Sequence, residues 1–215
     1  MKDLSKYIDH TNLKPEATSQ DIIKLCEEAK EHGFYSVCVN STYVPLCKKS
    51  LSGSDVKVCS VVGFPLGAMA TDAKFDEAEY AYSCGADEVD MVINIGAVKE
   101  GDFSKVADDI FRISTCAYEY EGILKVILET CLLTDDEIKK VCEISLESGA
   151  HFVKTSTGFN TGGATEAHVR LMKECVGNEA QVKASGGIRN KETALKMIAA
   201  GATRLGTSAS IEIIK

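Results

Sequence analysis

Short apolar runs alternate with longer amphipathic stretches along the whole chain. The short runs predict eight strands, at 7–10, 36–40, 57–62, 88–94, 124–130, 151–155, 181–185 and 204–207. The amphipathic stretches predict helices at 18–32, 41–51, 71–84, 103–119, 134–148, 164–175, 190–200 and, as a short one, 208–214. A strand followed by a helix, repeated along the chain, is typical of an α/β protein with a parallel sheet.

The junctions between these elements support the same interpretation. A glycine ends the helical pattern and a strand follows at Gly33, Gly85, Gly149 and Gly201. Glycine is the usual residue just past a helix end, because it adopts the left-handed conformation without strain. Capping-box spacing marks two helix starts, Thr18-x-x-Asp21 and Thr134-x-x-Glu137. Repeated junctions of one kind indicate a repeated structural unit.

Eight such units predict a closed (β/α)8 TIM barrel of minimal length, because barrels of this kind begin at about 200 residues. The chain has 215 residues, 45% of them apolar, and no linker or low-complexity segment interrupts it. We therefore expect a single domain over residues 1–215. The alternative is a doubly wound open sheet, but no predicted strand leads into a G-x-G-x-x-G turn.

Alternation within the strands separates an apolar face from a polar one. In the strand at 88–94, Val89 and Met91 lie on one side and Asp90 lies on the other. The apolar face must pack under the helices, so the polar side chains point into the barrel. The charged residues expected there are Asp9, Asp90, Lys125, Glu129, Lys154 and Lys183, and Cys38 is the one cysteine expected beside them. Barrels usually fill this space with branched apolar side chains, so a charged interior indicates function.

Lys154 lies in the centre of the segment 151–159, in an apolar strand that ends in a Ser/Thr/Gly turn. A second lysine, Lys183, is expected on the next strand but one, before another glycine turn. Two nearby ammonium groups disfavour each other's charge and lower the pKa of at least one, which provides the free amine of a Schiff-base nucleophile. The alternative is a lysine that is only paired with a carboxylate. Asp90 is then either an acid/base group or a plain counter-ion.

Glycine-rich turns follow the last two predicted strands. Ser185-Gly-Gly-Ile-Arg189 follows one of them, and Leu205-Gly-Thr-Ser208 follows the other. In (β/α)8 barrels these two turns often bind a phosphate group together with a short helix, and Gly158 is placed to add a backbone N–H. The alternative is that they are simple tight turns.

The bulk composition excludes several classes of partner. The formal charge is -8 without a basic run, so we expect no binding to nucleic acid or to an anionic membrane. No apolar run approaches the roughly 20 residues of a membrane span, and the N-terminal segment lacks the apolar region of a signal peptide, so we expect a cytoplasmic protein. The nine cysteines show no zinc spacing and the four histidines show no triad or metal spacing. We therefore expect buried free thiols and no metal site.

Five segments of the chain resemble the deoxyribose-phosphate aldolase family of class I, Schiff-base aldolases. They are Ile8-Asp-His-Thr11, Ser60-Val-Val-Gly-Phe-Pro65, Glu88-Val-Asp-Met-Val-Ile-Asn94, Phe152-Val-Lys-Thr-Ser-Thr-Gly158 and Val182-Lys-Ala-Ser-Gly-Gly-Ile-Arg189. The resemblance spans nearly the whole chain and implies a (β/α)8 barrel. It implies reversible cleavage of 2-deoxy-D-ribose 5-phosphate to acetaldehyde and D-glyceraldehyde 3-phosphate, in deoxyribonucleotide catabolism. It also implies a lysine Schiff base, with no metal and no cofactor.

The resemblance further implies roles for individual residues. Lys154 is the expected Schiff-base lysine, Lys183 the lysine that lowers its pKa, and Asp90 the proton relay. The expected phosphate contacts are Gly158, Gly186, Gly187, Arg189, Gly206 and Ser208. The residues expected at the sugar, two near its hydroxyls and one beside the lysine, are Asp9, Thr11 and Thr155.

Two positions depart from the family pattern. Some members carry a lysine where this chain has Phe159, so that phosphate contact is absent. Some members end in a mobile tyrosine tail, whereas this sequence ends Ile213-Ile-Lys215. We therefore expect proton transfer to rely on Asp90, Lys183 and water.

Several alternatives stay open at this point. The same turns and lysines suit another phosphosugar barrel, either a different aldolase or an isomerase. A sugar-phosphate binder without catalysis is a third interpretation. A homodimer and a homotetramer are both compatible with the sequence.

Overall fold

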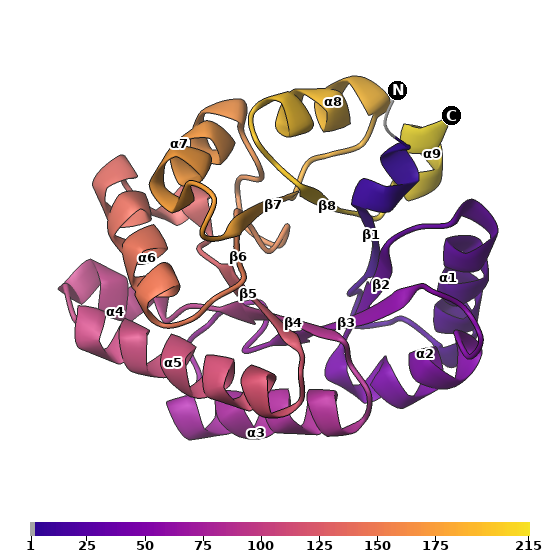
Figure 1. The fold of residues 1–215 in the computed structure, drawn as a ribbon, viewed down its shortest axis with the longest axis horizontal. Helices are drawn as coiled ribbons and strands as arrows, with labels where there is room; N and C mark the ends of the chain where they lie inside the picture. The colour runs from indigo at the N-terminus through magenta and orange to yellow at the C-terminus, as the bar shows by residue number, and fades with distance from the viewer. Residues whose placement is uncertain (1–2) are drawn as a thin grey trace.

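The computed structural model describes residues 3–215 and contains a closed barrel of eight parallel strands (Figure 1). The strands follow one another around the barrel in chain order, and the last pairs with the first. They are β1 (Ile8–Asn12), β2 (Ser36–Val39), β3 (Lys57–Val62), β4 (Glu88–Val92), β5 (Ile123–Ile127), β6 (Phe152–Lys154), β7 (Gln181–Ser185) and β8 (Arg204–Thr207). The predicted (β/α)8 barrel is confirmed, and the open sheet is excluded because a closed barrel has no edge strand.

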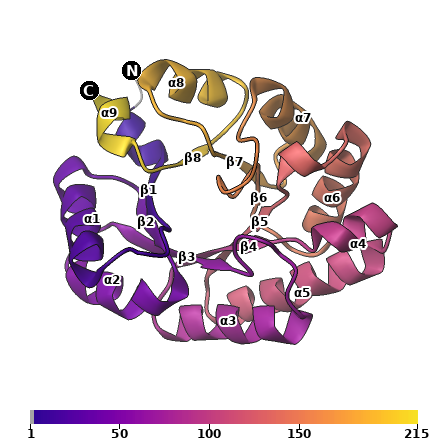
Figure 2. The same cartoon turned by 180° about the vertical axis from the view of Figure 1, so that it is seen from behind.

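Helices surround the barrel, as Figures 1 and 2 show from its two sides. They are α1 (Ser19–His32), α2 (Val44–Ser50), α3 (Thr71–Ser83), α4 (Ile95–Glu100), α5 (Phe103–Glu119), α6 (Asp135–Glu147), α7 (Glu166–Val176), α8 (Lys191–Ala199) and α9 (Ser210–Ile214). Short 3-10 turns in the described part of the chain are η1 (Leu4–Tyr7), η2 (Ser41–Tyr43) and η3 (Thr130–Leu132). The predicted spans of β3, β7, β8 and α5 are reproduced without change.

The predicted helix caps are present. The Thr18 N–H donates to Asp21 Oδ2 at 2.8 Å while Thr18 Oγ1 accepts from the Asp21 N–H, which completes the capping box of α1. Thr134 and Glu137 make the same pair of bonds at the start of α6. At the other end of α1, Gly33 adopts the left-handed conformation with φ 64°. These local signals therefore act as the sequence pattern indicated.

One helix was not predicted, and two strands, β4 and β5, end two or three residues earlier than expected. β4 ends at Val92, because Asn94 caps α4 instead of extending the strand, its Oδ1 accepting from the Ala97 N–H at 3.1 Å. α4 then ends at Gly101, which has φ 74°. β5 ends at Ile127 and η3 follows it. In both places the apolar run continues past the strand, so strand alternation cannot mark where the chain turns.

The apolar core lies between the strands and the helices. Val89, Met91, Val126 and Val182, from the faces predicted to be apolar, are fully buried in it. The opposite faces point into the barrel and carry the charged residues described below. Within residues 3–215, no helix combines the length and the apolar character needed to cross a bilayer.

Candidate active site

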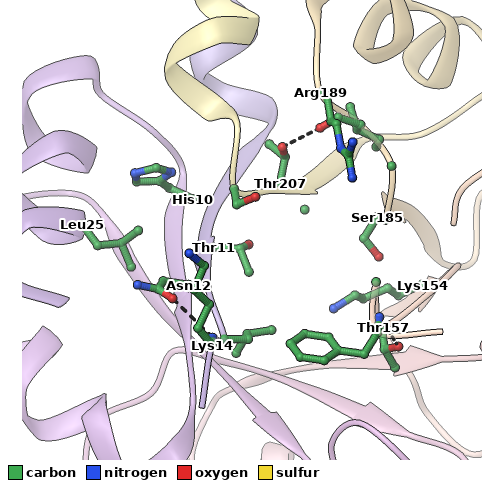
Figure 3. Close-up of a pocket in the computed structure, with 18 of the residues that line it drawn as sticks. His10, Thr11, Asn12, Lys14, Leu25, Lys154, Thr157, Ser185, Arg189 and Thr207 are labelled. Atoms are coloured by element: carbon green, nitrogen blue, oxygen red, sulfur yellow. Dashed lines mark hydrogen bonds between the residues drawn. The ribbon is translucent and has the colours of Figure 1, made fainter. Parts of the chain in front are cut away.

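A cavity of about 470 Å³ opens at the carboxyl ends of the strands (Figure 3). Its walls come from the segments that end or follow β1, β6, β7 and β8, together with residues of α1. Those four strands are consecutive around the closed barrel, so segments far apart in the sequence meet here. This is the end at which (β/α)8 enzymes place their active sites.

Most of the predicted site residues line this cavity. They are Lys154, Thr11, Gly158, Gly186, Gly187, Arg189, Gly206 and Ser208. Figure 3 shows the Lys154 amine pointing into the cavity, with Thr11 and Asn12 on the facing wall. The structure therefore places a lysine amine and several glycine turns around one space.

Two predicted sugar contacts, Asp9 and Thr155, are buried and do not line the cavity. Asp9 Oδ1 accepts from Arg204 Nη1 at 2.9 Å. Thr155 Oγ1 donates to the Ser185 carbonyl oxygen at 3.1 Å and accepts from the Ser185 N–H at 3.0 Å. Thr155 therefore stabilises the end of β7, and contact of either residue with a sugar stays a prediction.

Asp90 is fully buried in the barrel and accepts hydrogen bonds from three lysines. Its Oδ2 lies 2.7 Å from Lys154 Nζ and 2.7 Å from Lys183 Nζ. Its Oδ1 lies 2.8 Å from Lys125 Nζ. One carboxylate is thus the common partner of the three lysines that alternation predicted to point inward.

The ion-pair network extends to two charged residues that sequence reasoning did not single out, Glu88 and Arg204. Arg204 Nη1 lies 2.9 Å from Asp9 Oδ1 and 2.9 Å from Glu88 Oε2. Lys125 Nζ lies 2.6 Å from Glu88 Oε2, and Lys183 Nζ contacts Asp9 Oδ2. Parity along the strand would have found Glu88, because it stands two residues before Asp90.

Two expectations about the charged interior are corrected. Lys154 and Lys183 do not stand on strands separated by another strand, because β6 and β7 are direct neighbours and the two residues pair in register. Glu129 stands beyond the end of β5, and its carboxylate accepts hydrogen bonds from Thr157 instead of joining the network around Asp90. The order of the strands in the barrel decides the first point, and the turn after β5 decides the second.

The network sets the charge states of its buried members. Burial opposes ionisation of Asp90, but the ammonium groups of Lys125, Lys154 and Lys183 outweigh it and hold the Asp90 pKa well below its usual range. Burial likewise opposes the charge on Lys183, yet Asp9 and Asp90 raise its pKa above the ordinary lysine value. Lys183 therefore remains an ammonium, and its pKa shifts in the opposite direction to that expected from a lysine pair alone.

The three lysines differ in their access to the cavity. Lys154 lines it, whereas Lys125 and Lys183 do not, and both of these are fully buried. Lys154 Nζ pairs with the single carboxylate of Asp90, whereas Lys183 Nζ pairs with two carboxylates. Among the described lysines of the network, Lys154 is the one whose amine can meet a bound carbonyl compound.

Cys59 also points into the barrel, so Cys38 is not the one cysteine there. The two pair in register on β2 and β3, and Cys59 Sγ lies 3.2 Å from Asp90 Oδ1. Cys38, Cys59 and Asp90 place potential ligand atoms within 4.8 Å of one another. The Lys125 ammonium donates to both Cys59 and Asp90, so two of these three groups already have a cationic partner.

The comparisons with known proteins agree with this geometry. The model of the DeoC/LacD family aldolases matches residues 4–209. The chain belongs to this aldolase family. A relative from Thermococcus gammatolerans named deoxyribose-phosphate aldolase is 58% identical over 215 residues, which are 99% of this chain and 96% of that protein.

Solved structures of similar proteins share the fold of this DeoC/LacD family member. A putative deoxyribose-phosphate aldolase from Coccidioides immitis has a TM-score of 0.96 and 46% identity, covering 99% of this chain and 84% of that one. A tetrameric deoxyribose phosphate aldolase from Aeropyrum pernix has a TM-score of 0.92 and 34% identity, covering 98% of this chain and 89% of that one.

The glycine turns of this aldolase leave backbone donors free. Gly158, Gly186 and Gly187 have φ values of 84°, 84° and 78°, which favour glycine. The backbone N–H groups of these three residues and of Ser208 have no hydrogen-bond partner among residues 3–215. Successive free N–H groups in such turns form concave sites for anions. Together with the cationic Arg189, they make this wall of the cavity able to accept an anion.

Gly206 is required by the close approach of Lys183. A Cβ at Gly206 would lie 3.0 Å from Lys183 Cε and 3.0 Å from Ser185 Cβ. We expect Gly206→Ala to displace the Lys183 side chain, lowering kcat about tenfold and the unfolding free energy by about 1–3 kcal/mol through overpacking. Steady-state kinetics and urea unfolding measure both effects. In the matched control, Gly96→Ala in α4, the nearest atom is 3.4 Å away and neither quantity should fall; equal losses in the two variants would contradict the packing argument.

Proposed function

We propose that the chain is a class I aldolase that cleaves 2-deoxy-D-ribose 5-phosphate reversibly to acetaldehyde and D-glyceraldehyde 3-phosphate. The observation that carries the proposal is that Lys154, alone of the three lysines around Asp90, lines a cavity whose wall also holds the free N–H groups of the glycine turns. An amine nucleophile and an anion site thus face one space. The names of the relatives support the choice of substrate.

The ion-pair network around Asp90 holds more positive than negative charge. The linked ion pairs join four cationic side chains to three carboxylates, so one positive charge is in excess when all of them are ionised. The cations are Lys125, Lys154, Lys183 and Arg204, and the carboxylates are Asp9, Glu88 and Asp90. Excess like charge in a buried region is costly and favours loss of one proton. Lys154 has the fewest carboxylate partners among the lysines of the network, and its amine is the one that reaches the cavity.

The reaction then proceeds from residues already in contact. The Lys154 amine attacks the sugar aldehyde carbon, water leaves, and a protonated imine forms. The protonated imine at C1 withdraws electrons from the C2–C3 bond. As the C3 hydroxyl gives up its proton to a base, this bond breaks, C3 becomes the aldehyde carbon of D-glyceraldehyde 3-phosphate, and a two-carbon enamine stays on Lys154. Protonation of the enamine and hydrolysis of the resulting imine release acetaldehyde and restore the amine.

Asp90 and Lys183 serve the proton transfers in this proposal. Asp90 Oδ2 contacts both Lys154 Nζ and Lys183 Nζ, so it can relay a proton between the two amines or through water. The Lys183 ammonium places a fixed positive charge beside the Lys154 amine, on the same Asp90 oxygen. Thr11 and the predicted contacts Asp9 and Thr155 serve sugar binding, directly or by holding the residues that line the cavity.

Wider features of the proposal follow from the same chemistry. Schiff-base chemistry needs no metal and no cofactor. We propose one catalytic domain over residues 1–215, a cytoplasmic location supported by nine free cysteines, and a homo-oligomer. The tetrameric neighbour from Aeropyrum pernix supports a homotetramer over a homodimer. We propose no nucleic-acid or membrane partner for this protein.

Product analysis tests the proposed substrate. Purified protein incubated with 2-deoxy-D-ribose 5-phosphate is expected to release acetaldehyde and D-glyceraldehyde 3-phosphate in equal amounts, each measured by a coupled dehydrogenase assay. A ribose 5-phosphate control should yield no acetaldehyde. Turnover of another sugar phosphate without acetaldehyde would favour a different phosphosugar barrel enzyme. Thermal stabilisation by the sugar without any product would favour a binder.

A further inference from the structure

Glu129 is a buried carboxylate for which the proposed reaction has no use. It follows β5, is 1% exposed and does not line the cavity. Its backbone adopts the left-handed conformation, with φ 56° and ψ 60°. This conformation is unfavourable for a residue with a Cβ, and such strain persists where the surroundings require that side chain. Glycine would adopt this backbone conformation with less strain, so the glutamate side chain itself is what the position requires.

The Glu129 carboxylate binds one residue of the turn after β6 through both of its oxygens. The Thr157 N–H donates to Glu129 Oε1 at 3.2 Å, and the Thr157 hydroxyl donates to Glu129 Oε2. The same hydroxyl oxygen accepts from the Phe159 N–H at 3.1 Å. A carboxylate that accepts two hydrogen bonds matches these donors, whereas its protonated form would place an O–H against one of them.

These bonds determine which backbone N–H groups of the 157–159 turn are used inside the protein and which one is left free. The N–H groups of Thr157 and Phe159 are consumed inside the protein, by Glu129 and by the Thr157 hydroxyl. The N–H of Gly158 between them has no partner among residues 3–215. Gly158 lines the cavity with Gly186, and a Cβ added to Gly158 would lie 3.7 Å from Gly186 Cα. We call the hydrogen bonds that run from Glu129 through Thr157 to the Phe159 N–H the Glu129 relay. The relay leaves the Gly158 N–H free, beside the glycine turn at Gly186.

We propose that Glu129 is a positioning residue that acts through Thr157 to hold the 157–159 turn in the shape that binds the phosphate end of the substrate. The inference rests on the proposed function in that the ligand is a phosphosugar. Its physical basis is that a preorganised donor binds an anion without first having to be ordered. Without the relay, the turn can rotate its N–H groups away from the cavity.

The test separates phosphate binding from general stability. Thr157→Val keeps the shape of the side chain but removes the hydroxyl, and Glu129→Gln places amide hydrogens against one of the Thr157 donors. Thr157→Ser keeps the hydroxyl and is the conservative control. For each protein, kcat/KM is measured on 2-deoxy-D-ribose 5-phosphate and on unphosphorylated 2-deoxy-D-ribose. The rise in Tm caused by inorganic phosphate is measured in parallel.

Both relay variants are expected to lose preference for the phosphorylated sugar. The ratio of kcat/KM between the two substrates should fall about tenfold, the value of one charge-assisted hydrogen bond, mainly through KM. The stabilisation by phosphate should shrink in parallel, and Thr157→Ser should retain both properties. Equal losses on both substrates, or an unchanged response to phosphate, would overturn the proposal. If wild-type protein releases no acetaldehyde, the proposed function fails, while the phosphate-dependent Tm still tests the relay.

Discussion

Lys154→Ala is expected to abolish both turnover and covalent trapping of the substrate. Borohydride reduces an imine to a stable amine, so wild-type protein incubated with 2-deoxy-D-ribose 5-phosphate and borohydride should gain the mass of a reduced adduct on Lys154. In the variant the adduct should disappear and kcat should fall at least about a thousandfold, the scale on which loss of a nucleophile acts. Intact-mass and peptide mass spectrometry measure the adduct.

A buried lysine outside the Asp90 network provides the matched control. Lys74 is fully buried between α3 and α5, and its Nζ lies 2.6 Å from Asp109 Oδ2, away from the cavity. Lys74→Met removes an ion-paired lysine of similar burial, so it should lower stability while the adduct still forms on Lys154. Trapping that survives in Lys154→Ala, or an adduct that maps to Lys125 or Lys183 in wild-type protein, would contradict the assignment.

Asp90→Asn is expected to be the most destabilising polar substitution in the barrel. The change keeps the shape of the side chain but removes the anion that Lys125, Lys154 and Lys183 share. Four cations then face two carboxylates, so the unfolding free energy at neutral pH should fall by about 3–5 kcal/mol, the cost of leaving buried charge uncompensated. Turnover should fall as well, because Asp90 can no longer transfer a proton between the Lys154 and Lys183 amines. Urea unfolding and steady-state kinetics measure these effects.

The pH dependence of this loss has a defined sign. In wild-type protein the pKa values of Lys125 and Lys183 are raised, so the stability they contribute is fully present below the ordinary lysine pKa of about 10.4 and is lost only above it. In Asp90→Asn, Lys125 and Lys183 lose the Asp90 anion, so their pKa values should fall. The variant should therefore regain stability as the pH rises from about 7 toward about 10, because its folded state releases protons before the unfolded chain does.

A surface variant controls for the chemistry of the substitution. Asp136 pairs with Lys139 on α6 and its side chain is 93% exposed, so Asp136→Asn should change the unfolding free energy by less than about 0.5 kcal/mol at any of these pH values. A gap between wild-type protein and Asp90→Asn that stays constant from neutral to alkaline pH would contradict the proposed charge balance.

The proposed chemistry explains why the barrel keeps a charged interior, although burying charged groups is costly. Asp9, Glu88 and Asp90 are buried together with their cationic partners, although barrels usually fill this space with apolar side chains. Buried ion pairs add little net stability relative to apolar packing. Their retention is therefore explained by the proposed chemistry, which needs a neutral amine and a fixed ammonium within reach of one carboxylate.

Local signals in the sequence were sufficient for the elements and for the inward-facing lysines. Alternation along β4, β5 and β7 placed Asp90, Lys125 and Lys183 on the inner face, because successive side chains of a strand point to opposite sides whatever lies around them. The same reasoning missed Glu88 and Arg204, although parity also places both inside. It did not predict α4, because the apolar run continues from the strand into this helix and the cap at Asn94 sets the boundary between them.

The sequence by itself determined the repeated strand-helix units, their caps and the polarity of each strand face, because these depend on residues close together in the chain. Only the tertiary structure decided which groups touch. The strand order sets Lys154 beside Lys183 on adjoining strands, and barrel closure pairs β8 with β1 and brings Arg204 to Asp9. It also leaves Lys154 facing the cavity while Asp9 and Lys183 are buried, since burial is the result of packing between distant segments.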